Sequence, residues 1–277
     1  MTNDHKPQPG AGFAWVETQA GPALVCRPLE RHASHLFTTR QWALGSPTLD
    51  DGGRRAAWRQ LAETMGKDEF QLARLRQVHG VSVVVRRPEP SSPRVAGRVD
   101  TANTEPLPEA DVIVSIDPSV AIAIQTADCT PILIADPVTR AVAAAHAGWR
   151  GLAEGAPAVA VRALVEHAGA RAADLVVAIG PAISAARYEV GADVRQRFDT
   201  SGFDPAHLAR WFPSVTRPQH WLFDGWEAAR DQLVDAGVPP GQVHVAALCT
   251  ATYPDVFCSY RRDGILAGRL AAAIAAT

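Results

Sequence analysis

Two strand-sized apolar runs, residues 132–135 and 142–145, constrain the fold more than any other feature of the chain. Each run is too short for a typical helix and is bounded by turn residues, so both are predicted to be buried strands. The Asp-Pro pair at residues 136–137 predicts a turn between them. Cys129 lies just before the first run and His146 directly follows the second. We therefore expect a thiol and an imidazole to meet at one edge of a sheet, where ligands commonly bind in α/β proteins.

Strand-like and helix-like segments alternate along the rest of the chain. Further strands are predicted at residues 13–16, 23–26, 35–40, 70–76, 81–85, 111–115, 120–124, 175–179, 243–247 and 257–260. Helices are predicted at residues 55–64, 152–169, 190–198, 205–211, 225–236 and 265–276. Loops are expected at residues 41–54 and 86–108, which are rich in Gly, Pro, Ser and Asp.

These segments predict an α/β fold, as a single domain with a mixed β-sheet core flanked by helices. The domain is expected to span residues 11–277, after a polar, disordered leader at residues 1–10. The chain has 277 residues and is 47% apolar, which is enough to bury a sizeable core.

Composition also narrows the class of partners. The formal net charge of −2 gives no bulk attraction for nucleic acid or for an acidic membrane surface. No stretch reaches the roughly 20 apolar residues of a membrane-spanning helix. Four cysteines do not make a disulfide scaffold in a chain this long, and the N-terminal residues have no signal-peptide core. We therefore expect a cytoplasmic protein without a nucleic acid or membrane partner.

Three residues share one pattern: His79, Cys129 and His146 each lie at the edge of a predicted strand and precede small residues or a turn. Two imidazoles and a thiolate, with a fourth position left for water or substrate, are one known pattern for a catalytic zinc site. Taken singly, each residue also fits an ordinary role, because a buried cysteine often acts as a small apolar side chain. Copper is less favoured, since the chain has no His-x-His pair and its two methionines are poorly placed as axial ligands.

Polar residues beside these three could bind substrate. Asp128 is predicted either to orient a ligand or carry a proton, or else to cap backbone N–H groups in a turn. Adjacent arginines in an extended chain face opposite sides, so at most one of Arg261 and Arg262 should face the cleft; an ion pair with Asp263 is the alternative. The candidates for binding an anionic group of the substrate are Arg40, Arg150, Arg261 and Arg262.

Several short motifs now stand in a distinctive order along the chain. They are QVHG at residues 77–80, AD at 110–111, TADCTP at 126–131, HAGWRG at 146–151, IGPAI at 179–183, YEV at 188–190, CT at 249–250 and FCSYRRDG at 257–264. Together they resemble the YfiH-type laccase-domain family, from about residue 35 to the C-terminus. Members of that family have been called polyphenol oxidases and are also described as purine nucleoside phosphorylases.

The resemblance implies a one-domain α/β fold and a zinc ion held by His79, Cys129 and His146. It implies phosphorolysis of adenosine, inosine and methylthioadenosine, with adenosine deamination as a further activity. The partners would be a nucleoside and phosphate. Some bacterial relatives are instead linked to amide hydrolysis, dependent on cysteine or on zinc, that edits peptidoglycan precursors. The family usually has a Gly-Gly turn after Thr-Arg, whereas Arg40 is followed here by QWALG, so this loop is expected to differ in shape.

Three other interpretations stay open. Cys129 and His146 could act as nucleophile and base on an amide or ester, in which case chelators would leave activity intact. A copper-dependent polyphenol oxidase is the second. A non-catalytic binding module is the third, but it would be expected to lose one of the three ligands, and all three are present.

Overall fold

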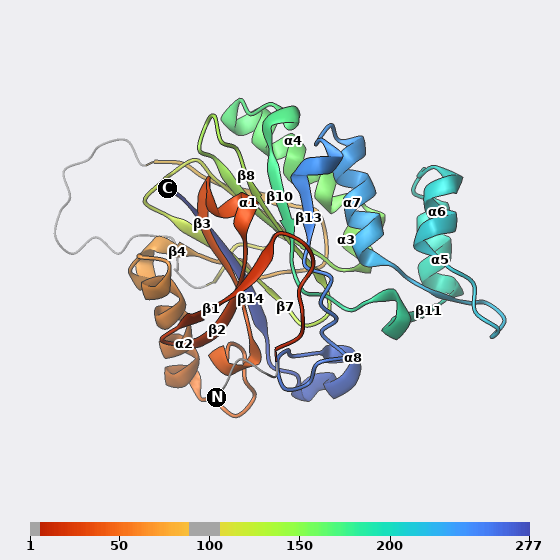
Figure 1. Cartoon of the computed structure of the whole chain (residues 1–277), viewed down its shortest axis with the longest axis horizontal. Coiled ribbons are helices and arrows are strands. Elements are labelled where there is room, and N and C mark those ends of the chain that lie inside the picture. The colour runs from red at the N-terminus through yellow and green to blue at the C-terminus, as the bar shows by residue number, and fades with distance from the viewer. Residues whose placement is uncertain (1–5, 89–105) are drawn as a thin grey trace.

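A computed structural model of the chain describes residues 6–88 and 106–277. Its centre is built from two six-stranded sheets, with helices on the outside (Figure 1). A small two-stranded sheet, β11 (Glu189–Gly191) with β12 (His220–Leu222), lies apart from them.

The first sheet has the strand order β1-β2-β3-β14-β7-β4. All neighbours in it are antiparallel except β4 and β7, so the sheet is mixed. Its strands are β1 (Phe13–Thr18), β2 (Gly21–Cys26), β3 (Ala33–Thr38), β14 (Leu270–Ala276), β7 (Ala121–Thr126) and β4 (Leu72–Ala73).

The second sheet has the order β13-β10-β8-β9-β6-β5 and is mixed as well, because both of its outermost pairs are parallel. Its strands are β13 (Val243–Val245), β10 (Val176–Ile179), β8 (Thr130–Ala135), β9 (Val142–Ala147), β6 (Val112–Ser115) and β5 (Val83–Arg86).

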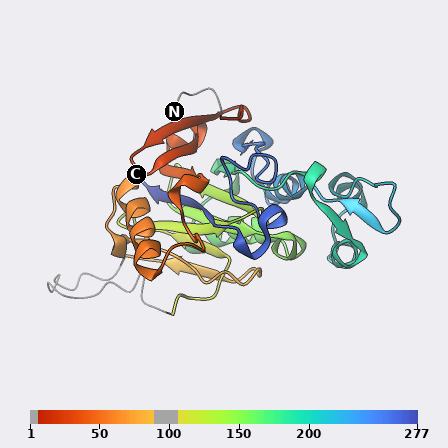
Figure 2. The ribbon, with the colours of Figure 1, turned by 90° about the horizontal axis from the view of Figure 1, so that it is seen from below.

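In the described part of the chain, eight α-helices lie around the two sheets. They are α1 (Arg27–Glu30), α2 (Asp51–Thr64), α3 (Trp149–Ala153), α4 (Ala156–Ala168), α5 (Ala192–Asp199), α6 (Pro205–Trp211), α7 (Gly225–Asp235) and α8 (Tyr260–Asp263). Short 3-10 turns lie at Arg40–Trp42, Glu69–Gln71, Ala172–Asp174, Ala185–Arg187, Pro240–Gln242 and Gly264–Leu266. Figure 2 shows α5 and α6 at one end of the molecule and α2 at the other.

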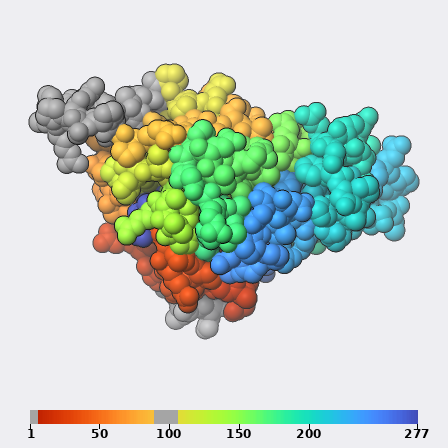
Figure 3. All heavy atoms as spheres, turned by 90° about the horizontal axis from the view of Figure 1, so that it is seen from above, coloured from red at the N-terminus to blue at the C-terminus, as the bar shows by residue number. Residues whose placement is uncertain are grey.

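Three buried clusters fill the spaces between four layers. One packs α2 on the outer face of the first sheet, the second lies between the two sheets, and the third joins the second sheet to α3, α4 and α7. In Figure 3 the residues of α4 (green) and α7 (blue) lie side by side on the surface. The central strands of the second sheet, β6, β8, β9 and β10, are buried on both faces, so their residues are mainly apolar and do not alternate with polar ones.

The α/β class with mixed sheets is confirmed, although the core contains two large sheets where one was expected. The helix expected at residues 152–169 is two helices, separated at Gly155, which has a φ of 82°. The strand expected at residues 70–76 is reduced to Leu72–Ala73, and the one expected at residues 257–260 is wrong, since α8 begins at Tyr260.

The helix expected at residues 265–276 is also wrong, because Leu270–Ala276 forms β14 in the middle of the first sheet. Alanine favours helices, but a segment buried on both faces takes its conformation from tertiary packing. Ala271, Ala273 and Ala275 face α2, whereas Ala272 and Ile274 face the second sheet. Small side chains allow this strand to fit between two packed layers.

Part of the predicted leader contacts the fold. Gly10 donates its N–H to the carbonyl of Ala246 at 2.8 Å, and the indole of Trp15 donates to the carbonyl of Pro7 at 2.9 Å. Residues 1–5 of the leader and residues 89–105 of the expected loop lie outside the described residues, so the domain boundaries stay a prediction. None of the helices in the described part of the chain has the length and apolar character needed to cross a bilayer.

One buried histidine couples the stability of the fold to pH. His35 of β3 accepts the N–H of Cys26 through Nε2 at 2.8 Å, and its Nδ1 lies 3.2 Å from the carbonyl of Ala33. These contacts need the neutral ring, and burial lowers the pKa of His35 from 6.5 to about 4.

We expect His35 to stabilise the protein at neutral pH and to lose that contribution in acid. The pKa is lower in the folded state, so the contribution is complete above pH 6.5 and is lost as the pH falls toward 4. The loss should approach about 3 kcal/mol. Urea unfolding of the wild type and of His35→Gln across this range measures it, and parallel pH profiles would show that His35 is not the cause.

Candidate active site

A β-hairpin brings Cys129 next to His146. Strands β8 and β9 pair antiparallel, with Pro131 opposite His146 and Thr130 opposite Ala147. Cys129 immediately precedes β8, so its side chain lies at the same end of the hairpin as the imidazole. The expectation that the second apolar run delivers His146 at its end is therefore confirmed.

His79 reaches this point on the loop between β4 and β5, which is shaped around one carboxylate. The Oδ2 atom of Asp111 accepts the N–H groups of Val78 at 3.1 Å and Gly80 at 2.8 Å, while Oδ1 accepts the N–H of His79 at 3.0 Å. His79 has a φ of 63°, a left-handed conformation that is uncommon for residues other than glycine. Three N–H donors on a buried carboxylate compensate for that conformation.

The same carboxylate fixes His146. Nδ1 of His146 lies 2.8 Å from Oδ1 of Asp111, and both side chains are almost fully buried. A carboxylate on Nδ1 sets the ring orientation and leaves Nε2 for another partner, which is the usual arrangement behind a metal-bound histidine.

The three side chains converge into one cluster. One ligand atom from each of His79, Cys129 and His146 lies within 4.8 Å of the others, and the two imidazole rings are 4.9 Å apart at 83°. Gly148 leaves room for them, because a Cβ there would lie 3.0 Å from the Cys129 sulfur and 3.1 Å from Cδ2 of His79. Across the described residues, this is the one group of three such side chains close enough to share a metal ion.

Charge pairing dominates the chemistry of the cluster. Burial on its own would raise the pKa of Cys129, but the imidazoles of His146 and His79 outweigh it and lower this pKa to about 6. Burial would lower the pKa of His146, but Cys129 and Asp111 outweigh it and raise this pKa to about 9. The cluster therefore favours a thiolate, which is the form that binds a metal or acts as a nucleophile.

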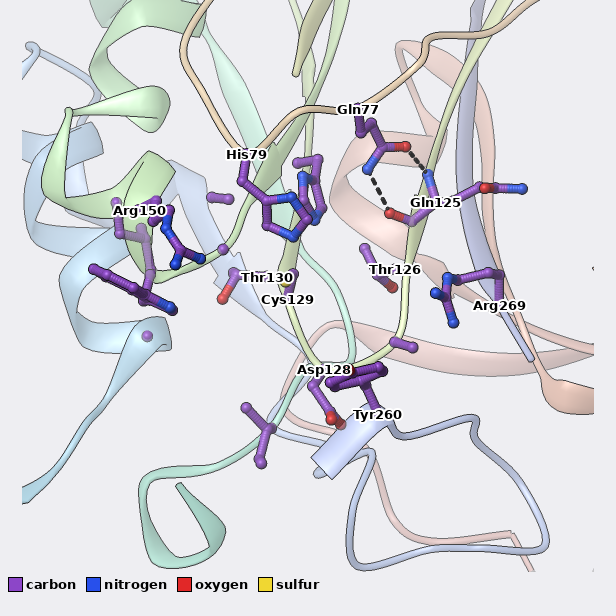
Figure 4. Close-up of a pocket in the computed structure, with 18 of the residues that line it drawn as sticks. Gln77, His79, Gln125, Thr126, Asp128, Cys129, Thr130, Arg150, Tyr260 and Arg269 are labelled. Carbon is purple, nitrogen blue, oxygen red and sulfur yellow. Dashed lines mark hydrogen bonds between the residues drawn. The ribbon is translucent and has the colours of Figure 1, made fainter. Parts of the chain in front are cut away.

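The cluster opens into a cavity of about 890 Å³. Figure 4 shows His79 and Cys129 at its centre, Arg150 on one side and Arg269 on the other. Gln77 ties the His79 loop to β7, since its side chain donates to the carbonyl of Gln125 at 2.8 Å and accepts the N–H of Gln125 at 2.7 Å.

The predicted arginines divide into two groups. Arg150 and Arg261 line the cavity and stack on aromatic rings, Arg150 on Trp149 at 4.3 Å and Arg261 on Tyr188 at 4.8 Å. The structure does not bring Arg40 or Arg262 to the cavity.

The two other arginines have structural partners. Arg40 donates its side chain to the carbonyl of Pro254. Arg262 binds Asp263 and the carbonyls of Thr250 and Phe257. The ion pair considered as an alternative for Arg262 is therefore present, since Arg262 and Asp263 lie 2.7 Å apart.

Asp128 lines the cavity but directs its carboxylate into the protein. It accepts the hydroxyl of Thr250 at 2.6 Å and the backbone N–H of Arg261 at 2.6 Å. Its φ of 92° places it in a strained turn before Cys129. The contacts connect the cysteine turn to the start of α8, which fits a positioning role better than proton transfer.

No role for Asp111, Gln77 or Arg269 follows from the sequence alone. Asp111 lies directly before a buried strand, which is the same signal that pointed to Cys129. Gln77 lies two residues before His79. Arg269 was hidden by the incorrect C-terminal helix, because it lies just before β14 and enters the cavity from there.

Comparison with known proteins identifies the family. Residues 40–277 match the family model described as multi-copper polyphenol oxidoreductase laccase. The chain belongs to this family.

Two relatives and one solved structure illustrate the similarity, which extends over 61% to 95% of this chain. The Streptomyces coelicolor protein named purine nucleoside phosphorylase is 36% identical over 267 residues, which cover 95% of this chain and 94% of the relative. A Bacteroides thetaiotaomicron protein of the same name is 38% identical over 170 residues, 61% of this chain and 62% of its own length. The crystal structure of the Bacillus licheniformis hypothetical protein YfiH has the same fold, with a TM-score of 0.80 and 24% identity over 92% of this chain and 96% of that one.

Replacing Asp111 by asparagine tests how the cluster is held. An amide has one acceptor atom where the carboxylate has two, so at least one N–H donor of the His79 loop or of His146 faces an NH₂ group. We expect Asp111→Asn to weaken Zn²⁺ binding by about 10- to 100-fold and to cost about 1–3 kcal/mol of unfolding free energy.

Competition with a chromophoric chelator measures the affinity for Zn²⁺, and urea unfolding measures the stability. Asp193→Asn is the matched control, because Asp193 is exposed on α5 and outside the cavity. Equal Zn²⁺ affinity in wild type and Asp111→Asn would contradict the role assigned to this carboxylate.

Proposed function

We propose that this protein is a zinc-dependent purine nucleoside phosphorylase acting on adenosine, inosine and methylthioadenosine in the cytoplasm. The observation that carries the proposal is one cavity that joins the His79, Cys129 and His146 donors to Arg150 and Arg261. The phosphorylase name carried by a relative that aligns over 94% of its length supports it.

The donor set fits zinc. Two imidazoles and one thiolate provide three of the four ligands of a tetrahedral catalytic site, and Asp111 orients His146 from behind. When bound, zinc would supply a Lewis acid that polarises the substrate and makes water more acidic. Copper fits less well, because Met65 is buried against the first sheet and is not placed to be a weak axial ligand.

In phosphorolysis, Arg150 and Arg261 hold the phosphate. Planar guanidinium groups match phosphate oxygens with paired N–H donors. Arg261 is held in place because its Nη1 donates to the carbonyl of Glu189 at 3.0 Å. A phosphate oxygen then bonds to C1′ of the ribose, the C1′–N9 bond breaks, and the purine leaves with the electron pair and takes up a proton.

Adenosine deamination is proposed as a second activity of the same cavity. Water adds at C6 of adenine and ammonia leaves, so the net products are inosine and ammonia. Both activities depend on the three clustered side chains. Substitutions at His79 or Cys129 should therefore remove them together.

Amide hydrolysis of a peptidoglycan precursor is the second candidate, with Cys129 as nucleophile and His146 as the base that takes up the thiol proton. The observation that favours it is the arrangement of the three side chains: the ligand atoms of Cys129 and His146 lie within 4.8 Å of each other, and Asp111 holds Nδ1 of His146 at 2.8 Å. Against burial, which would raise it, the neighbouring imidazoles lower the pKa of Cys129, which favours the same candidate. A free thiolate nucleophile acts without a metal, so resistance to chelators would distinguish this candidate from the phosphorylase.

Product analysis by mass spectrometry tests the proposal. Zinc-loaded protein is incubated with phosphate and adenosine, inosine or methylthioadenosine. We expect free base and ribose 1-phosphate (or its methylthio analogue) in wild type, and a loss of about 100-fold or more in His79→Ala and Cys129→Ala. A chelator should have the same effect.

His167→Ala is the matched control, because His167 is exposed on α4 and does not line the cavity. It should keep the wild-type rate. If the zinc-loaded wild type releases no base from any of the three nucleosides, the phosphorylase proposal fails. Chelator-resistant hydrolysis of an amide substrate, lost in Cys129→Ala, would establish the second candidate.

A further inference from the structure

The wall of the cavity carries more positive charge than one phosphate needs. Arg150, Arg261 and Arg269 line it, and none of the three has a carboxylate partner among the ion pairs of residues 6–88 and 106–277. Asp128 is the one carboxylate on the wall formed by these residues, and its two oxygens already accept from Thr250 and from the backbone of Arg261. A cavity with this balance favours anionic ligands.

Two of these charges, those of Arg150 and Arg269, lie on opposite sides of the cluster. Figure 4 shows Arg150 on one side of His79 and Cys129, and Arg269 on the opposite side near Gln125 and Thr126. The cluster thus stands between two cationic walls. One inorganic phosphate on the Arg150 side leaves the other wall without an anion.

Arg269 is held ready for a ligand. Its Nη1 donates to the carbonyls of Ala267 at 2.9 Å and Gly268 at 3.0 Å, and its backbone N–H donates to Leu44 at 2.6 Å. The stem of the side chain packs against Gly45, where an added Cβ would lie 2.6 Å from Cγ of Arg269. Two carbonyls orient the guanidinium but do not neutralise its charge. A pre-oriented, half-buried guanidinium suits the bidentate recognition of a phosphate group.

We propose, building on the phosphorylase function above, that Arg269 forms a second anion subsite for the 5′-phosphate of a nucleoside 5′-monophosphate. The co-substrate phosphate binds on the Arg150 side. Its oxygen bonds to C1′, the C1′–N9 bond breaks, and the electron pair and one proton go to the base. The products are a free purine and ribose 1,5-bisphosphate. A cavity of about 890 Å³ lies in the upper part of the range for small-molecule sites and has room for both ligands.

The test compares adenosine 5′-monophosphate with adenosine in zinc-loaded protein. We expect the wild type to use the nucleotide with a kcat/KM about 10- to 100-fold higher, the size of one charged contact. Arg269→Gln should lower the value for the nucleotide to that for adenosine, and change adenosine by less than about threefold. Arg269→Lys keeps the positive charge but not the paired N–H donors of the guanidinium, so its kcat/KM for the nucleotide should lie between those of the wild type and Arg269→Gln. Arg55→Gln, on the exposed surface of α2, is the matched control.

Calorimetric titration of the protein with adenosine 5′-monophosphate, in the absence of phosphate, measures binding independently of turnover. Weaker binding to Arg269→Gln than to wild type supports the subsite. Cleavage of adenosine without preference for the nucleotide overturns the subsite and leaves the phosphorylase function intact. Equal losses for both substrates, with a raised KM for phosphate, overturn it by assigning Arg269 to the co-substrate. If neither compound is cleaved and the nucleotide does not bind, both proposals fail. If Arg269→Gln does not fold, the proposal is tested by the preference of the wild type for the nucleotide over adenosine and by the kcat/KM of Arg269→Lys for the nucleotide.

Discussion

The buried carboxylate of Asp111 is the contact on which the site depends. It accepts three successive N–H groups of the His79 loop and holds Nδ1 of His146, so one side chain sets the positions of both imidazoles. A buried negative charge is costly unless it is fully compensated. Here the same contacts that compensate it also build the site. The hydrogen bonds of His146 and of the His79 loop keep the pKa of Asp111 low despite the burial that raises it.

The two-sheet core explains why the remaining parts meet at this edge. The β8–β9 hairpin is buried on both faces, so its register is strongly determined and Cys129 cannot slip relative to His146. Asp111 immediately precedes the neighbouring strand β6, which pairs with β9. Strand β14 of the other sheet begins just after Arg269, which brings the C-terminal segment to the same cavity. A rigid scaffold thus supports loops that carry the functional groups.

The sequence predicts the parts of the site that local pattern controls. Cys129 and His146 lie at the ends of apolar runs whose length and bounding turns indicate strands, and their proximity follows from a hairpin. The roles of Asp111 and Arg269 could not be predicted from local pattern, because they arise from contacts with residues far away in the chain. The alanine-rich segment before the C-terminus shows the limit most clearly. Its composition favours a helix, and only burial between α2 and the second sheet makes it a strand.

Whether the cluster binds a metal or acts as a thiolate–imidazole pair decides the chemistry. Both chemistries depend on the same three side chains. If the cluster binds zinc, the purified protein should hold about one zinc per chain. The Cys129→Ser variant should then hold less than about a tenth of that amount. Elemental analysis of the two proteins by mass spectrometry, after gel filtration, measures this directly. Equal zinc in both proteins, or a metal-free wild type that keeps full activity in a chelator, would contradict it.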